Sequence, residues 1–146
     1  MVRKAIQAVG PLSLSQFHTR CLHMVRVTAG GIRRGVEQGN VHIEGKTSYA
    51  GVQGADVVTS IDLAAQRQLA ELAARYMPPQ VGYIGEEQGL RRPSTFTGRS
   101  VVLTFDPADG TRRLIAAMRD KRPLAPGEVS VMLGVQVDGK AVAGYI

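Results

Sequence analysis

Residues 101–111 read VVLTFDPADGT, and the expected fold is built around the strand end that they contain. The first five of these residues are apolar or β-branched, which predicts a buried strand. Proline has no backbone N–H, so we expect strand pairing to stop at Asp106-Pro107. The following DGT sequence predicts a sharp turn into a short helix over about residues 111–118, with N–H groups available to bind an anion. Two carboxylates beside such a turn suggest a divalent metal that bridges protein and phosphate.

Other acidic residues lie in similar positions along the chain. Residues 81–84 (VGYI) predict a short strand, and Glu86 and Glu87 follow at its C-terminal end. Further upstream, Asp56 and Asp62 lie around the expected start of an amphipathic helix. Carboxylates that a fold brings together must either raise their pKa values or share a cation. A metal is the simpler of the two solutions.

Each acidic motif alone also has an ordinary structural interpretation. An aspartate before a helix, such as Asp56 or Asp62, is typical of an N-cap. The pair Glu86-Glu87 alone is more often solvated than liganded, and Asp109-Gly110 alone is most often a turn. The functional interpretation is favoured because one reaction would use all three motifs.

In this order the three motifs resemble the inositol monophosphatase superfamily of magnesium-dependent, lithium-sensitive phosphatases, which includes fructose bisphosphatases and bisphosphate nucleotidases. The motifs are D-x-x-T-x-x-D at 56–62, G-E-E at 85–87 and D-P-x-D-G-T at 106–111. The likeness runs from about Asp56 to Ile146. It implies a magnesium-dependent phosphomonoesterase that hydrolyses a small phosphorylated metabolite, similar to inositol phosphate, with metal-activated water. A bisphosphate nucleotidase of the same superfamily is the alternative.

The resemblance also implies a site for two or three Mg²⁺ ions. It assigns the side chains of Glu86, Asp106 and Asp109 and the backbone carbonyl of Ala108 as metal ligands. These are hard oxygen donors, which Mg²⁺ prefers. Glu87 follows a ligand but points to the other side of an extended backbone, so we expect it to hold a metal-bound water.

The catalytic roles come from the same resemblance. Asp62 and Thr111 resemble the pair that orients and deprotonates the attacking water, in which the hydroxyl donates to the carboxylate and accepts from water. The N–H groups of Gly110 and Thr111 would bind the substrate phosphate. No covalent intermediate is implied.

The sequence departs from the family pattern in two places. Family members carry a further Trp-Asp motif in a second half, which supplies another metal-ligand carboxylate, whereas this sequence has no tryptophan. We therefore expect residues 1–146 to form the N-terminal metal-binding domain of a phosphatase whose second half is absent. If the chain is naturally truncated, a noncatalytic binding or assembly module is the alternative. In addition, the connection over residues 112–129 is longer than is usual in the family.

Patterns of apolar residues predict an α+β fold. Helical spacing predicts helices over residues 13–38 and 61–77, joined by a loop rich in Gly, Ser and His. Asp138-Gly139 predicts a hairpin between strands at 129–137 and 141–146, because both residues tolerate positive φ. Together with the resemblance, this gives two long helices packed on a mainly antiparallel sheet, the first half of a sugar-phosphatase αβαβα sandwich.

Two features of the first helix have structural interpretations. Cys21 falls on the apolar face and predicts a buried, unreactive thiol. Gly30-Gly31 predicts a close helix–helix contact or a local weakening of the helix, because no strand precedes these glycines as in a nucleotide-binding motif.

The composition fits one globular domain with an N-terminal extension over residues 1–12. A chain of 146 residues with 44% hydrophobic residues can bury a core. The single cysteine and the lack of a membrane-spanning run favour a cytoplasmic protein with no membrane partner. The net charge of +6 attracts anions such as a phosphorylated metabolite, but sparse aromatics and scattered arginine pairs argue against nucleic acid. We also expect a homodimer, because half of the fold would expose a sheet edge and an apolar face.

Overall fold

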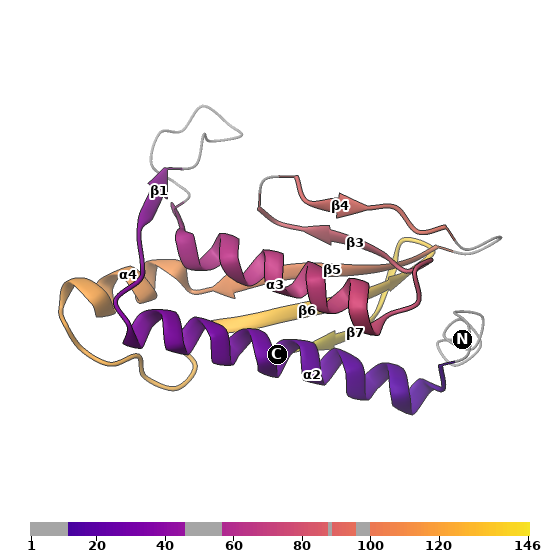
Figure 1. Cartoon of the computed structure of the whole chain (residues 1–146), viewed down its shortest axis with the longest axis horizontal. Coiled ribbons are helices and arrows are strands. Elements are labelled where there is room, and N and C mark those ends of the chain that lie inside the picture. Colours follow the sequence, from indigo (N-terminus) through magenta and orange to yellow (C-terminus); the bar gives the residue numbers. More distant parts are fainter. Residues whose placement is uncertain (1–11, 46–56, 88, 96–99) are drawn as a thin grey trace.

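The computed structural model describes residues 12–45, 57–87, 89–95 and 100–146. In this part of the chain two long helices lie along one face of a five-stranded sheet (Figure 1), which confirms the predicted α+β layering. None of the helices formed by the described residues is both long and apolar enough to cross a bilayer. The elements in chain order are α2 (Leu14–Glu37), β1 (Ile43–Gly45), β2 (Val57–Thr59), α3 (Ser60–Tyr76), β3 (Gly82–Gly85), β4 (Arg91–Arg92), β5 (Val101–Asp109), α4 (Thr111–Arg119), β6 (Ser130–Val137) and β7 (Lys140–Tyr145).

Helix α2 forms because its first turn is capped and its apolar residues share one face. The Ser13 hydroxyl accepts a hydrogen bond from the Gln16 N–H at 3.2 Å, and the Gln16 side chain accepts one from the Ser13 N–H at 2.8 Å. The predicted first helix is confirmed to within one residue at each end. Its buried residues recur at helical spacing, namely Phe17, Cys21, Met24, Val25, Thr28 and Ile32.

Helix α3 is capped by Thr59 and not by an aspartate. The Thr59 side chain accepts from the Asp62 N–H, and the Asp62 carboxylate accepts from the Thr59 N–H at 2.7 Å. Asp62 is therefore not the N-cap residue but completes its capping box, and Asp56 lies outside the described residues. The helix ends at Tyr76, close to Pro78, as predicted from the residues that cannot continue a helix.

The two long helices approach each other closely at glycines of α2. A methyl group built on Gly31 would lie 2.7 Å from the Gln68 Oε1 of α3, and one on Gly35 would lie 3.1 Å from the Ile61 Cδ1. A larger residue at Gly31 would therefore displace the Gln68 side chain. The interpretation of the Gly30-Gly31 pair as a helix–helix contact is confirmed at Gly31.

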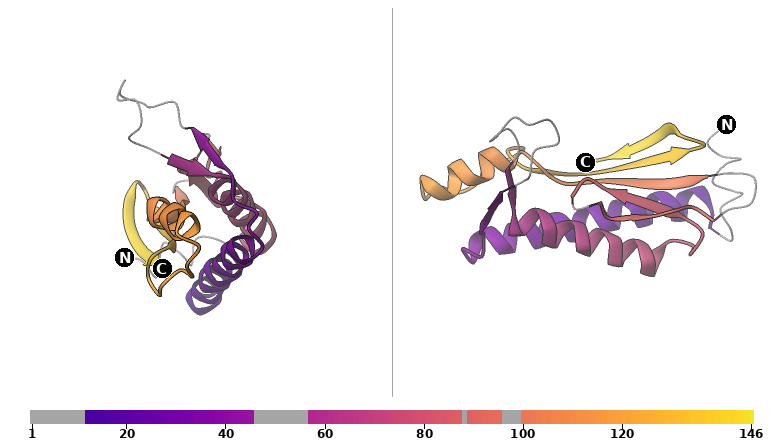
Figure 2. Two further views of the ribbon diagram at one scale, coloured as in Figure 1. Left: turned by 90° about the vertical axis from the view of Figure 1, so that its left-hand side faces the viewer. Right: turned by 90° about the horizontal axis from the view of Figure 1, so that it is seen from above.

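The five-stranded sheet has the order β4-β3-β5-β6-β7. Strands β3 and β5 are parallel and the other neighbours are antiparallel, which confirms a mainly antiparallel sheet. The predicted hairpin joins β6 to β7, with Asp138 at φ 52° and Gly139 at φ 74°. Figure 2 shows α2 and α3 on one side of this sheet, with α4 beyond one of its ends.

Strand β5 extends further than the sequence predicted. Pairing with β6 continues past Pro107, from Asp106 opposite Met132 to Asp109 opposite Ser130. The register shifts between these two pairs, so the proline lies in a bulge where a ladder N–H is not needed. The prediction that pairing stops at the proline is wrong. Asp106 and Asp109 both belong to the C-terminal part of β5, on either side of the bulge.

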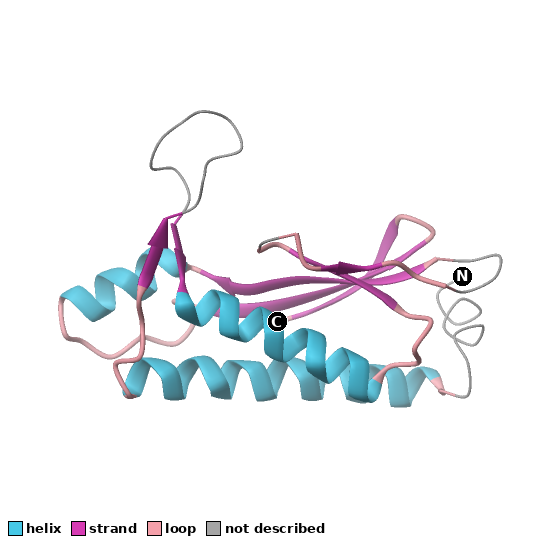
Figure 3. Ribbon diagram, turned by 45° about the horizontal axis from the view of Figure 1, so that its top comes forward, coloured by secondary structure: helices cyan, strands magenta, loops and turns pink. Residues whose placement is uncertain are grey.

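Two short pairings involve strands that the sequence did not predict. Strands β1 and β2 form a separate two-stranded sheet, with Ile43 opposite Thr59. Strand β4 pairs with β3 through Arg91 and Arg92, within the polar stretch before β5. Figure 3 shows the β1–β2 pair standing apart from the main sheet, at the end where α3 begins. Short strands of this kind depend on their partner strand and leave little periodicity in the sequence.

Candidate metal and phosphate site

Two acidic residues are brought together by the parallel pairing of β3 and β5. Gly85 lies opposite Phe105, so the next residues along the two strands are Glu86 and Asp106. The Glu86 N–H donates to the Phe105 carbonyl at 3.1 Å, which extends the ladder up to the acidic pair. Parallel strands have their C-terminal ends at the same edge of a sheet, where sites commonly form.

The carboxylates at this edge repel one another. The pKa of Asp106 is raised to about 6, first by burial and then by the negative charges of Glu86 and Asp109. A hydrogen bond with the Glu86 side chain also raises it, whereas a bond from the Ala108 N–H opposes the rise. Three predicted ligand side chains therefore form one electrostatic cluster. A bound cation would relieve this repulsion.

The donor chemistry of the cluster fits a hard divalent cation. Glu86 and Asp109 are exposed and Asp106 is partly buried, so the oxygens are accessible from solvent. In the part of the chain that the structure describes, no three acidic, histidine or cysteine side chains are gathered closely enough to enclose an ion alone. Mg²⁺ retains several waters and often takes its remaining ligands from phosphate, so it does not require a closed protein cage.

The acidic pair borders a hollow on the open face of the sheet. This hollow has a volume of about 550 Å³, within the range of small-molecule sites. It is lined mainly by apolar surface beyond the carboxylates, from Thr104, Phe105, Met132, Leu133, Gly134, Gly144, Tyr145 and Ile146. A small organic molecule would find both charge and apolar contact there.

A partly buried hydrogen bond joins the start of α3 to the start of α4. The Thr111 hydroxyl donates to the Asp62 Oδ1 at 2.8 Å, although the residues are 49 positions apart. Asp62 is only 3% exposed, and its other oxygen accepts from the N–H and the hydroxyl of Thr59. The structure thus brings together the two residues predicted to orient water. The N-cap interpretation of Asp62 also holds in part, because Asp62 completes the capping box of α3.

The Thr111 hydroxyl has a second acceptor within reach. The Ala108 carbonyl lies 2.9 Å from it, whereas a hydroxyl carries only one hydrogen. The carboxylate of Asp62 is the stronger acceptor because it is charged. We therefore assign the Thr111 proton to Asp62, which leaves the Ala108 carbonyl able to serve as a ligand.

The predicted phosphate-binding turn has the geometry that the DGT sequence suggested. Gly110 has φ 100°, in the left-handed region, and is the N-cap of α4 without a side-chain cap. Its carbonyl accepts from the N–H groups of Arg113 at 2.8 Å and Leu114 at 3.1 Å. The N–H groups before these two belong to the first turn, where a helix leaves donors for an anion.

Glu87 is held by a glutamine that sequence reasoning missed. Glu87 is 5% exposed whereas Glu86 is exposed, in line with side chains on opposite sides of the backbone. The Gln66 Oε1 accepts the Glu87 N–H at 2.7 Å, and the Gln66 Nε2 donates to the Glu87 carbonyl. A methyl group on Gly85 would lie 2.3 Å from the Gln66 Oε1, so the glycine beside the two glutamates was the available signal.

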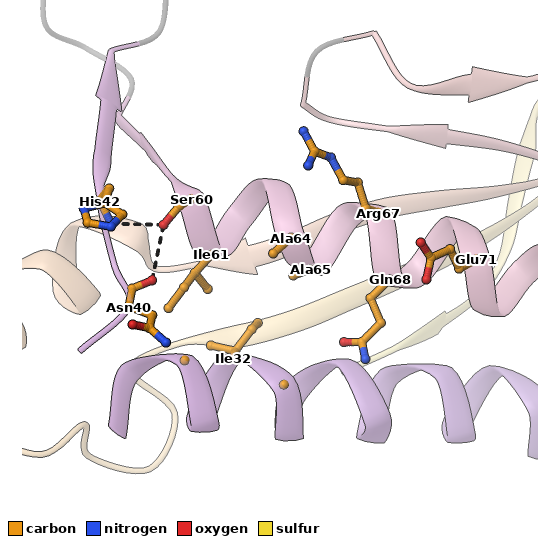
Figure 4. A pocket seen from close by; sticks show the side chains of 12 residues that line it. Ile32, Asn40, His42, Ser60, Ile61, Ala64, Ala65, Arg67, Gln68 and Glu71 are labelled. Carbon is orange, nitrogen blue, oxygen red and sulfur yellow. Dashed lines mark hydrogen bonds between the residues drawn. The ribbon is translucent and has the colours of Figure 1, made fainter. Parts of the chain in front are cut away.

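A second hollow lies between α2 and α3, away from the acidic cluster (Figure 4). Its volume is about 660 Å³, and its lining includes Arg67 and Glu71. At one end the Ser60 hydroxyl accepts the His42 N–H at 3.0 Å, which holds β1 against the start of α3. This contact supports the position of Thr59 and Asp62 from outside the site.

Cys21 and two histidines of α2 have structural contacts. Cys21 is fully buried, and burial raises its pKa to about 12, which confirms the predicted unreactive thiol. The His18 Nδ1 lies 3.3 Å from the Tyr145 hydroxyl, and the His23 ring packs edge-on against Tyr76. These histidines contact aromatic residues at the helix surface.

Comparison with solved structures shows the same fold in several proteins. The extragenic suppressor protein suhB from Bartonella henselae has a TM-score of 0.68 at 19% identity, over 88% of this chain and 43% of that one. An IMPase/NADP phosphatase complexed with NADP and Ca²⁺ has a TM-score of 0.64 at 21% identity, over 92% of this chain and 44% of that one. The Thermotoga maritima IMPase TM1415 has a TM-score of 0.59 at 22% identity, over 83% and 39%. The chain therefore spans less than half the length of these proteins.

Sequence comparison gives the family directly. No curated protein matches the chain. The sequence profile of the inositol monophosphatase family matches residues 16–146, which include all of the described site residues. The chain belongs to the inositol monophosphatase family.

Proposed function

We propose that the polypeptide containing this chain is a magnesium-dependent phosphomonoesterase that hydrolyses a small phosphorylated metabolite, similar to inositol phosphate. The observation that carries this proposal is the partly buried bond from the Thr111 hydroxyl to the Asp62 carboxylate, beside a cluster of carboxylates. One solved neighbour of the same fold is described as a dual specific IMPase/NADP phosphatase bound with D-inositol-1-phosphate. Family membership supports phosphate ester hydrolysis as the reaction class.

Glu86, Asp106, Asp109 and the Ala108 carbonyl would hold the metal. When bound, Mg²⁺ would neutralise the charge of the phosphate and make a coordinated water more acidic. Two or three ions are proposed, with phosphate oxygens and waters as the other ligands. Glu87 would hold one of those waters by its carboxylate, while Gln66 fixes its backbone.

The chain's own residues would prepare the attacking water. Thr111 gives its hydrogen to Asp62, so its oxygen can accept a hydrogen from water and orient the water toward phosphorus. Thr59 holds the other oxygen of Asp62, which fixes the carboxylate as the final proton acceptor. The N–H groups at Gly110 and Thr111 would bind phosphate oxygens as the new P–O bond forms and the ester P–O bond breaks.

Phosphate release by the full polypeptide that contains residues 1–146 tests this proposal. Turnover of inositol 1-phosphate should require Mg²⁺ and should fall about 10²–10⁴-fold in Asp62→Asn and Thr111→Val, the range of general-base effects. Glu37→Gln, which removes a carboxylate from an exposed ion pair on α2, is the matched control and should retain activity. Faster turnover of adenosine 3′,5′-bisphosphate would instead favour the nucleotidase. Metal-dependent turnover of neither substrate would reject the enzymatic function.

Partners and location are proposed on the sequence grounds given above. We propose a cytoplasmic homodimer that acts on a small phosphorylated metabolite without a nucleic-acid or membrane partner. Strand β7 lies at an edge of the sheet, where a further strand or chain could pair. Sedimentation of the full polypeptide at several concentrations would give its oligomeric state.

A further inference from the structure

The segment after α4 is closed by an ion pair within a short loop, residues 122–128. Arg122 donates two hydrogen bonds to the Glu128 carboxylate, at 2.7 and 2.8 Å. The Ala125 N–H donates to the same carboxylate at 2.6 Å, and the Glu128 N–H donates to the Ala125 carbonyl at 3.1 Å. Three donors therefore fix one carboxylate, and the 122–128 loop has a defined shape despite its exposed position.

The 122–128 loop contacts both ends of α4. At the end of the helix, the Arg122 N–H donates to the Ala117 carbonyl at 3.0 Å. At the start, the Glu128 carbonyl lies against Gly110, where a built methyl group would be only 2.2 Å from that oxygen. The backbones of Gly110 and Glu128 are thus in direct contact. A shift of the Glu128 backbone would therefore also move the turn at Gly110 from which α4 begins.

Apart from the 122–128 loop, helix α4 is fixed by the Thr111–Asp62 bond at its start and by a small buried face. It has nine residues, and only Leu114 and Ala117 are buried. A helix of this length is marginal without tertiary contacts. Its first turn carries no acidic residue but has Arg112 and Arg113, whose charges oppose the helix dipole. Contacts at its ends must therefore hold the orientation of its first N–H groups.

We propose that the Arg122–Glu128 pair is a positioning device for the phosphate-binding turn, because it holds the Glu128 carbonyl against Gly110. This inference rests on the proposed function in one respect, namely that the turn binds phosphate. The Glu128 carboxylate stays charged near neutral pH, since the bonds from Arg122 lower its pKa to about 2. Exposed ion pairs contribute little to overall stability, so the expected effect is local to α4.

Amide hydrogen exchange measured by NMR on the 146-residue chain tests whether the Arg122–Glu128 pair holds the turn at Gly110 in place. The Arg113 and Leu114 N–H groups report on the turn because both donate to the Gly110 carbonyl. In Glu128→Gln and Arg122→Lys their exchange should be about tenfold faster, since lysine cannot form the two-pronged bond. Glu37→Gln breaks a comparable ion pair on α2 and should leave both rates unchanged. Equal rates in Glu128→Gln and Glu37→Gln would overturn the proposal.

Phosphate binding tests the functional part. Calorimetric titration with inorganic phosphate in the presence of Mg²⁺ should show about three- to tenfold weaker binding in both loop variants. Faster exchange with unchanged phosphate affinity would mean that the pair is structural only, and would overturn the positioning role. If the parent chain binds no phosphate while exchange still rises, the contact with α4 stands and the phosphate role of the turn fails.

Discussion

The Asp62–Thr111 pair and the carboxylates Glu86, Asp106 and Asp109 belong to the same proposed site, but the fold balances their charges and hydrogen bonds differently. Asp62 is almost fully buried and receives donors from two elements. The open carboxylates instead raise the pKa of Asp106 to about 6 through burial and mutual repulsion. The fold therefore completes the proposed water-orienting half by itself, whereas the proposed metal-binding half would be completed by a ligand.

The two halves meet at Gly110, where substitution should have the largest effect. Gly110→Ala adds a methyl group 2.2 Å from the Glu128 carbonyl at a φ of 100°, so it should lower the free energy of unfolding by about 2–4 kcal/mol. Urea unfolding monitored by circular dichroism measures this loss. Gly127→Ala is the matched control, because Gly127 also has positive φ (79°) but nothing within 4 Å, and it should cost about 1 kcal/mol. Equal losses in the two variants would contradict the proposed backbone contact.

Removal of the buried carboxylate should have the next largest effect. Asp62→Ala leaves the Thr59 and Thr111 donors without their acceptor and removes the capping box of α3. The expected loss is about 1–3 kcal/mol of unfolding free energy, measured in urea. Asp120→Ala, at the exposed end of α4, should change stability by less than about 0.5 kcal/mol. A loss no larger than that of Asp120→Ala would mean that the buried half is not preorganised.

Neutralising an open carboxylate should act in the opposite direction. At pH 7, Asp106→Asn should stabilise the metal-free chain by about 1 kcal/mol, less than the full pKa shift implies because solvent screens the cluster. The pKa of Asp106 is about 6 in the folded chain, above its ordinary value of 3.8. The stabilisation that this carboxyl gives to the folded chain is therefore fully present below pH 3.8 and is lost as the pH rises through about 6. Thermal unfolding from pH 4 to 7 should show this loss in the parent chain and not in the variant. Mg²⁺ should raise the melting temperature of the parent chain only.

The smallest effect is expected at the 122–128 loop. The pKa of Glu128 is lowered from its ordinary value of 4.5 to about 2 in the folded chain. The stabilisation that its carboxylate gives to the folded chain is therefore present above pH 4.5 and is lost as the pH falls toward 2. The difference in melting temperature between the parent chain and Glu128→Gln should therefore shrink from pH 5 to pH 2. A constant difference would show that the charge of Glu128 contributes nothing to the loop.

Local sequence signals predicted most of the elements. Apolar spacing predicted α2 and α3 to within a residue or two, because an amphipathic helix must present one face to the core. Asp138-Gly139 predicted the β6–β7 hairpin, because only a few residues adopt positive φ at low cost. Strand β5 was predicted except for its C-terminal end. A strand can continue past Pro107 only because β6 pairs with it through a bulge, which the local sequence does not reveal.

The residues of the proposed site and the pairing of Thr111 with Asp62 were predicted, but the contacts that hold Glu87 in place were not. The DGT sequence predicted the turn at Gly110, and the resemblance to the family named the acids. Gln66 carried no recognisable signal of its own, because an amide on a helix is usually exposed. Its role arises only because α3 packs where its side chain meets the backbone of Glu87.

By itself, the sequence determined the elements, the turn chemistry and the family, since each depends on residues that are close together in the chain or form short motifs. Only the tertiary structure decided that β3 and β5 pair in parallel, which puts Glu86 beside Asp106. It also decided that Glu128 lies against Gly110, whereas the family resemblance had already implied the contact of Thr111 with Asp62. Such contacts depend on the balance between the packing of whole elements and the chain entropy lost in joining distant segments, which no local pattern records.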